Sequence, residues 1–118
     1  MLELQAGKLD AGESPLVCGQ RELLEETGYR AAEWAYAGKM HLAIGYSTEV
    51  IHIFFARGLV AGERSLDDGE FLDIIAMEAD DLIEGCRDGR VTDAKTISCC
   101  LWLQNVREAR WPLAWQPA

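Results

Sequence analysis

Four charged residues stand close together in the sequence, and the three carboxylates among them could bind a divalent cation. Arg21 and Glu22 are followed at once by Glu25 and Glu26. Residues three and four apart share one face of a helix, so the three carboxylates would gather there and repel one another. Solvent, Arg21 or a cation such as Mg²⁺ or Mn²⁺ could relieve that repulsion. A solvated acidic face is the more common reason for such a pattern, so the residues alone leave both interpretations open.

A helix is predicted to carry these side chains. Ser14 followed by Pro15 is a good N-cap and first-turn pair. Gly28 can adopt the left-handed conformation that ends a helix. The preceding segment 7–13 (GKLDAGE) is rich in turn-forming residues, so it should be a loop. Three leucines should form the buried side of the helix: Leu16, Leu23 and Leu24.

The acidic residues belong to a longer pattern. It reads Gly7, five residues, Glu13, seven residues, Arg21-Glu22-Leu23, one residue, Glu25-Glu26, one residue, Gly28-Tyr29. In this pattern the sequence resembles the Nudix hydrolase family, whose signature box is matched without a gap over residues 7–29. Segments 2–10 (LELQAGKLD) and 89–96 (GRVTDAKT) look like the corresponding parts of ADP-ribose pyrophosphatases.

The resemblance implies roles for individual residues. The metal ligands would be Glu22, Glu26, Glu70 and the backbone carbonyl of Ala6. Glu25 would be a further ligand or would orient the attacking water. Arg21 and Glu13 would hold the loop onto the helix and orient the carboxylates, while Gly7 and Gly28 would be structural members of the box.

An acidic loop at residues 67–70 (DDGE) is the second candidate for catalysis. The ADP-ribose pyrophosphatases that it resembles place a metal-binding carboxylate and a catalytic base there. We assign Glu70 first and Asp68 second. A solvated hairpin loop is the alternative, and it is nearly as good an explanation for Asp67 and Asp68.

The rest of the sequence predicts an α/β (α+β layered) fold in a single domain, residues 1–118, with a Nudix-type mixed sheet and flanking helices. Strands are expected at residues 1–5, 34–41, 49–59 and 71–77. Helices are expected at residues 79–88 and from Asp93, the latter with an apolar stripe at Ala94, Ile97, Leu101 and Val106. The family usually has several strands before the box, so we expect this domain to be truncated at its N-terminus.

Composition limits the possible functions. With 118 residues and 49% hydrophobic content, the chain suits one globular domain. Its net charge of −9 argues against binding to nucleic acid or to anionic membranes, and favours a divalent cation between carboxylates and any phosphate substrate. No leader or membrane-spanning run is evident, so a cytoplasmic location is expected.

Cysteine, histidine and tryptophan residues are given structural explanations. The four cysteines form no CxxC pair and should be reduced thiols, with Cys18 packing in the first helix. His52 is predicted to be a satisfied core residue and His41 a polar strand end. Burial is the usual role of large aromatic residues, which accounts for Trp34, Trp102, Trp111 and Trp115.

The predicted function is Mg²⁺-dependent hydrolysis of ADP-ribose to AMP and ribose 5-phosphate, with Mn²⁺ as a possible substitute. The same chemistry on another nucleoside diphosphate sugar is open, because the box holds the pyrophosphate rather than the base. A different class of protein, a non-catalytic module that binds metal or nucleotide without a full substrate pocket, is the alternative. The resemblance also implies a homodimer if the protein is complete.

Overall fold

The computed structural model describes residues 2–7, 9, 11–42, 45, 49–62 and 74–118. It has a mixed α/β fold, as predicted. The elements in chain order are α1 (Pro15–Thr27), β1 (Tyr29–His41), β2 (Val50–Ala61), α2 (Ala79–Asp88), α3 (Ala94–Arg107) and β3 (Gln116–Pro117). In the part of the chain so described, no helix is both long and apolar enough to cross a membrane.

The chain divides into two compact units. The sheet unit comprises Ala6–Glu70 and Leu113–Ala118, and it contains α1 and all three strands. The helix unit comprises Met1–Gln5 and Phe71–Pro112, and it contains α2 and α3. That both units form one domain stays a prediction.

Helix α1 begins and ends where its local sequence predicts. Ser14 is extended, and its hydroxyl accepts a hydrogen bond from the amide of Val17 at 3.3 Å. Pro15 follows in the first turn, where its missing amide hydrogen costs nothing. At the other end Gly28 has φ 78°, and its amide donates to the carbonyl of Leu24 at 2.9 Å. Both ends are therefore satisfied by local hydrogen bonds.

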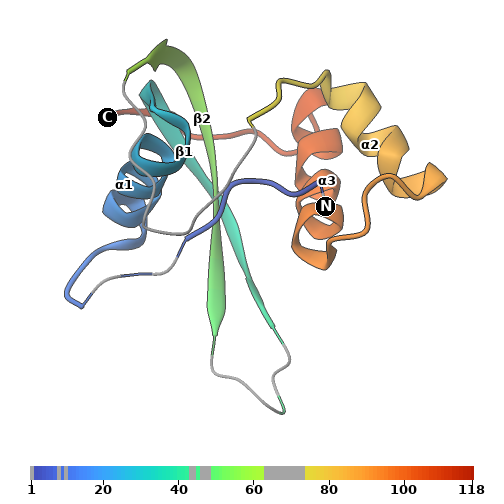
Figure 1. Cartoon of the computed structure of the whole chain (residues 1–118), viewed down its shortest axis with the longest axis horizontal. Coiled ribbons are helices and arrows are strands. Elements are labelled where there is room, and N and C mark those ends of the chain that lie inside the picture. Colours follow the sequence, from blue (N-terminus) through green and yellow to red (C-terminus); the bar gives the residue numbers. More distant parts are fainter. Residues whose placement is uncertain (1, 8, 10, 43–44, 46–48, 63–73) are drawn as a thin grey trace. The chain divides into compact units, whose positions relative to one another are not determined.

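The sheet is antiparallel, with the strand order β2-β1-β3. Figure 1 shows β1 and β2 as two long neighbouring strands. β1 and β2 form a long hairpin that pairs Tyr29 with Ala61 and His41 with Val50. The register shifts between Tyr36 and Gly38, which is a β-bulge. β1 begins at Tyr29, directly after the C-cap of α1, and so is longer than the strand predicted at 34–41.

Helix α1 packs on one face of this sheet. Gly19 lies against Trp34, and a Cβ at Gly19 would come 3.3 Å from the indole ring. Trp34 is buried and meets Phe54 edge to face, with ring centroids 6.1 Å apart. Cys18 is buried, as expected, and the three predicted leucines of α1 are half-buried.

The short strand β3 brings the C-terminal residues to the outer edge of β1. Gln116 pairs with Trp34, and the amide of Ala118 donates to the carbonyl of Ala32 at 3.0 Å. The guanidinium of Arg57 lies 4.0 Å from the centroid of Trp115, a cation–π contact. The C-terminal residues Leu113–Ala118 are thus part of the sheet unit.

In the helix unit, α2 and α3 pack against each other. Gly89 ends α2 with φ 90°, as predicted. Asp93 caps α3, and its carboxylate accepts from the amide of Thr96 at 3.0 Å and from the Thr96 hydroxyl at 2.8 Å. Thr96 and Val91 are almost fully buried and form the centre of the unit.

Two predicted strands are wrong over the residues that the structure describes. Residues 2–5 form no strand, because the amide of Leu4 donates to the hydroxyl of Thr96 at 3.0 Å instead of to a neighbouring strand. Residues 74–77 are also irregular and exposed. The remainder of that second prediction, residues 71–73, lies outside the described residues.

The buried face predicted for α3 is also wrong. Ile97 and Leu101 are 41% and 54% exposed, whereas Thr96 and Cys100 are buried. The hydroxyl of Thr96 accepts a hydrogen bond from the amide of Leu4, so the Thr96 side of the helix lies against the segment of residues 2–5. A polar residue with satisfied hydrogen bonds can occupy a core that a periodicity argument assigns to aliphatic residues.

Candidate functional site

Arg21 is the centre of the acidic cluster on α1. Its Nε donates to Oε2 of Glu13 at 2.8 Å and its Nη2 donates to Oε1 at 3.0 Å, so the pair is bidentate. The Glu13 side chain is only 10% exposed. Bidentate pairs between arginine and carboxylate combine energy with a defined geometry. The contact attaches the loop before α1 to the helix itself.

The same guanidinium also contacts two carboxylates of its own helix. Nη1 of Arg21 donates to Oε1 of Glu22 at 2.9 Å and to Oε2 of Glu25 at 3.1 Å. The Arg21 guanidinium therefore contacts three carboxylates among the described residues, those of Glu13, Glu22 and Glu25. An excess of negative charge in a half-buried place attracts cations.

The glycine at the start of the box lies directly against Glu22. A Cβ at Gly7 would overlap Cγ and Cδ of Glu22 and would come within 2.6 Å of its Oε2. Only a residue without a side chain lets the loop backbone approach this carboxylate so closely. The backbone next to Gly7, including Ala6, therefore lies beside a carboxylate of α1.

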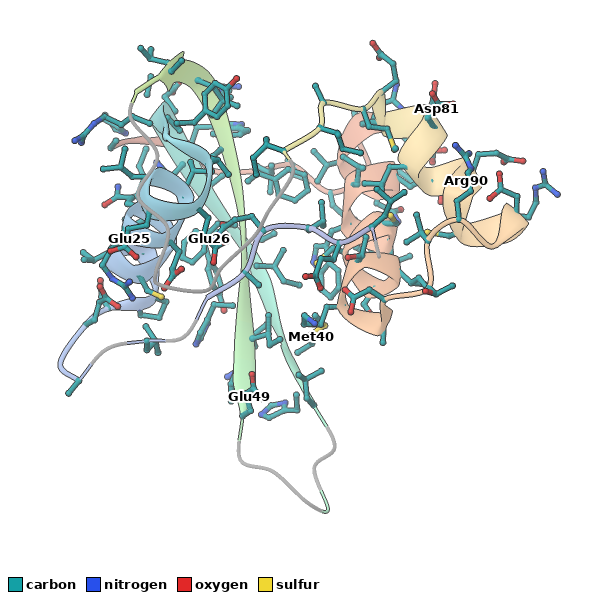
Figure 2. All side chains as sticks on the ribbon, viewed as in Figure 1. Glu25, Glu26, Met40, Glu49, Asp81 and Arg90 are labelled. Carbon is teal, nitrogen blue, oxygen red and sulfur yellow. The ribbon has the colours of Figure 1, made fainter. Side chains whose placement is uncertain are left out.

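Glu25 and Glu26 are adjacent residues of α1 and are both half-buried (Figure 2). Adjacent residues leave a helix about 100° apart, so their side chains take different directions. Glu25 is bound to Arg21, and Glu26 has interactions of its own. The structure thus gathers Glu22 and Glu25 at Arg21, and whether Glu26 joins them on a metal stays a prediction.

A metal ion would find suitable donors here. Carboxylate oxygens and a backbone carbonyl are the hard ligands that Mg²⁺ and Mn²⁺ prefer, and the loop backbone at Gly7 lies against Glu22. Within residues 2–7, 9, 11–42, 45, 49–62 and 74–118, no three Asp, Glu, His or Cys side chains already form a group that could hold a metal. Arg21 engages oxygens of Glu22 and Glu25 in this arrangement. The predicted residues Asp68 and Glu70 lie outside the described part of the chain.

Cys18 lies beside the cluster but is unsuited to act as a nucleophile. Its thiol is 6% exposed and lies 4.0 Å from Nη2 of Arg21. Burial, and after it the negative charge of Glu13, raises the pKa of this thiol. A thiol that resists ionisation is a poor nucleophile, which agrees with the packing role predicted for it.

The other residues considered for a site are placed as follows. His52 is half-buried and its Nδ1 lies 3.0 Å from the hydroxyl of Tyr36, so it has a hydrogen-bond partner as predicted. His41 is the exposed last residue of β1. Sequence reasoning missed the role of Thr96, which binds Leu4 three residues before Gly7. The resemblance of segment 89–96 to a closing segment was the signal that could have found it.

Comparison with known proteins gives one family and a set of relatives. The model of the NUDIX domain matches residues 2–98. A methanol dehydrogenase activator from Bacillus methanolicus is 36% identical over 106 residues, covering 88% of this chain and 57% of the relative. An ADP-ribose pyrophosphatase from Bacillus subtilis (strain 168) is 35% identical over 106 residues, with the same coverages of 88% and 57%.

A third relative carries a different substrate in its name. A GDP-mannose pyrophosphatase from Yersinia enterocolitica is 34% identical over 108 residues, covering 88% of this chain and 56% of the relative. The chain therefore spans little more than half the length of the curated relatives that it matches.

Proposed function

Because this chain belongs to the NUDIX domain family, we propose that it is a metal-dependent hydrolase that cleaves the pyrophosphate bond of a nucleoside diphosphate sugar. ADP-ribose is the substrate that we propose first, with AMP and ribose 5-phosphate as products. The single observation that carries this proposal is the half-buried group of Glu13, Glu22 and Glu25 around Arg21, with the loop backbone held against Glu22 at Gly7.

The proposed metal ligands are Glu22, Glu26, Glu70 and the carbonyl of Ala6. Bound Mg²⁺ or Mn²⁺ would polarise a phosphoryl oxygen and lower the pKa of a bound water. The carboxylates gathered at Arg21 support cation binding, and a bound cation would let the negatively charged pyrophosphate of the substrate approach them.

The protein's own residues would position and deprotonate the attacking water. Arg21 holds Glu13 and orients Glu22 and Glu25, so it is proposed as a positioning residue. Glu25, Glu70 and Asp68 are proposed as candidates for the base that accepts the proton of the water. A carboxylate within hydrogen-bond reach of that water could perform this step.

Two of the relatives support the pyrophosphate bond as the target, because their names are ADP-ribose pyrophosphatase and GDP-mannose pyrophosphatase. Both names are those of nucleoside diphosphate sugars, which differ in the base and in the sugar. The residues of the box do not contact a base in this proposal, so they leave ADP-ribose and GDP-mannose to be separated by assay.

The proposal is tested by replacing Glu26 with Gln in the full chain. Release of AMP from ADP-ribose, measured with and without Mg²⁺, should fall by at least roughly 100-fold, the scale seen when even the support of a metal ligand is disturbed. Glu84→Gln is the matched control, because Glu84 lies on the exposed face of α2 and pairs with Arg87. Full activity of the Glu26→Gln protein would refute the mechanism.

A second measurement separates the substrates and the rival class. Side-by-side assays with ADP-ribose and GDP-mannose should show which of these two substrates is preferred. Binding of Mn²⁺ without turnover of either substrate would instead favour the non-catalytic module. Homodimerisation and a cytoplasmic location remain predictions, and light scattering tests the first of them.

A further inference from the structure

A row of aromatic rings lies on the face of the sheet that α1 covers. A Cβ at Gly19 of α1 would come 3.3 Å from the ring of Trp34 and 3.9 Å from the ring of Phe54, so both rings lie on that face. Tyr36 follows Trp34 by two residues and pairs with Phe54, and the ring centroids of Tyr36 and Phe54 are 5.2 Å apart. Alternate residues of a strand share a face, so Tyr36 continues the row.

The two ends of this row differ in exposure. Trp34 is 5% exposed beneath α1, whereas Tyr36 is 46% exposed. β1 begins directly after the C-cap of α1 and reaches Gly19 at Trp34, so the strand runs back along the helix. Two strand residues advance about 6.7 Å, which equals the rise of roughly four or five helical residues. The Tyr36 ring therefore lies level with the start of α1, where the helix leaves the row open.

The exposed ring of Tyr36 is fixed by its neighbours. Its hydroxyl lies 3.0 Å from Nδ1 of His52, and the two rings are tilted by 45°. The ring of Phe54 meets it at 69°. Neither of these two neighbours is stacked face to face on the tyrosine ring. A flat ring that is already held in place can stack on a ligand with little further loss of conformational freedom.

His52 adds a polar group beside this ring. Its Nδ1 is used by the contact with Tyr36. Its other ring nitrogen, Nε2, makes none of the hydrogen bonds found among the described residues. As a donor Nε2 could bind a ring nitrogen of a heterocycle, and as an acceptor it could bind an amino group. The pair thus offers a stacking surface with a hydrogen-bonding group at its side.

We propose that Tyr36 and His52 form the site that binds the purine base of the nucleotide substrate. This inference rests on the proposed function, in which the pyrophosphate lies at the acidic cluster of α1 and the box does not contact the base. The base would stack on the Tyr36 ring, and one hydrogen bond with His52 would orient it.

The spacing of the two sites fits such a ligand. Both belong to the sheet unit, and α1 packs on β1. Glu22 lies three residues beyond Gly19, roughly 4.5 Å along α1, and Tyr36 lies about 6.7 Å from Gly19 in the opposite direction. The separation along the helix is therefore about 11 Å. A ribose and two phosphates can span that length.

The test is binding of AMP to the full chain in the presence of Mg²⁺, with ribose 5-phosphate as the ligand that lacks a base. Tyr36→Ala should weaken AMP binding roughly 5–150-fold, the range for loss of stacking between a base and an aromatic ring. It should leave binding of ribose 5-phosphate unchanged. Tyr36→Phe should lose less affinity than Tyr36→Ala, because the ring remains. Isothermal titration calorimetry measures these affinities.

Trp111→Ala is the matched control. Trp111 is 39% exposed and meets Trp102 edge to face with ring centroids 6.0 Å apart, so it resembles Tyr36 in exposure and in having a ring contact. Because Trp111 is outside the proposed base site, this variant should bind AMP as the wild type does. Equal weakening by Trp111→Ala and Tyr36→Ala would overturn the proposal.

Nuclear magnetic resonance of the wild-type protein gives a readout that needs no variant. Nuclear Overhauser effects should join the base protons of AMP to the ring protons of Tyr36, which decides the matter even if Tyr36→Ala prevents folding. Absence of AMP binding to the wild type, or an AMP affinity that does not depend on Tyr36, would overturn the base site.

Failure of the base site and failure of the proposed function are distinguishable. Hydrolysis of ADP-ribose together with AMP binding that ignores Tyr36 would refute only the base site. Binding of AMP at Tyr36 without hydrolysis of ADP-ribose would support the base site and refute only the proposed activity.

Discussion

Replacing Gly7 with alanine should weaken cation binding by the sheet unit much more than it lowers the stability of that unit. The new Cβ would occupy the space of the Glu22 carboxylate, so that side chain must rotate away. Gly7 is not among the residues with positive φ, which are Gly12, Gly28, Gly58, Gly89 and Ala109 among the described residues. Alanine at this position therefore causes no backbone strain. The substitution should act by displacing the Glu22 side chain.

The expected loss of stability is small. Forcing Glu22 away from its preferred rotamer costs roughly 0.5–1.5 kcal/mol. The smaller conformational freedom of alanine in the unfolded chain offsets about 0.4–1 kcal/mol of this. The net change should be no more than about 1 kcal/mol, which corresponds to a few degrees in Tm for a chain of this size.

The loss of metal binding should be much larger. If Glu22 is a ligand that Gly7 helps to place, Mn²⁺ should bind roughly 10–100-fold more weakly, the range found when the support of a ligand is disturbed. Titration followed by the electron paramagnetic resonance signal of free Mn²⁺ measures this affinity, and thermal melts measure stability.

Gly45→Ala is the matched control, because a Cβ there has no atom within 4 Å among the described residues. It should leave both the melt and Mn²⁺ binding unchanged. Unchanged Mn²⁺ affinity in the Gly7→Ala protein would refute the reasoning that the close approach of the loop positions Glu22. A large loss of stability would show instead that the Glu22 side chain cannot move.

Arg21→Ala should lower stability by about 1–3 kcal/mol, because Glu13 and Glu22 lose their charged donor, and Mg²⁺ should restore part of the Tm by taking its place. No restoration by Mg²⁺ would contradict a cation site here, and Arg87→Ala, which removes an exposed arginine, is the control. Asp93→Ala should cost about 0.5–2 kcal/mol at pH 7, because the side-chain cap of α3 is removed. The hydroxyl of Thr96 holds the pKa of Asp93 below its usual range, so the contribution of this carboxylate is complete above pH about 4 and is lost as the pH falls further. Urea unfolding from pH 7 to pH 2.5 should therefore show the difference between wild type and variant shrinking below pH 4, and a difference that grows there would be inconsistent with this sign.

Local signals in the sequence predicted the helices well. Ser14, Pro15 and Gly28 bound α1 through contacts that span four residues or fewer, so the sequence near each end was sufficient. The same is true of Gly89 and Asp93 at the ends of α2 and α3. The prediction that Arg21 and Glu13 meet came from the resemblance of the box, and the bidentate pair is present.

Long-range hydrogen bonds decided the features that the sequence predicted wrongly. Leu4 and Leu2 alternate with polar residues as a strand would, but the amide of Leu4 binds Thr96, which lies 92 residues further along. Ile97 and Leu101 repeat at the spacing of a buried stripe but are exposed, whereas Thr96, which binds the distant Leu4, and Cys100 are buried on a side of α3 about 100° away. The periodicity of apolar residues does not predict that a polar residue will be buried. Such burial depends on a hydrogen bond to a residue that is distant in the sequence.

By itself, the sequence determined the positions of the helices, the carboxylates of the box and the chemistry that their spacing allows. Only the tertiary structure decided that the backbone at Gly7 lies against Glu22 and that Trp115 lies on Arg57. Helix caps and helix faces depend on neighbours a few residues away, so short patterns in a sequence record them. Contacts between distant segments depend on how the helices and strands pack. That packing is decided by the balance of many small interaction energies over the whole chain, and a short sequence pattern does not contain this information.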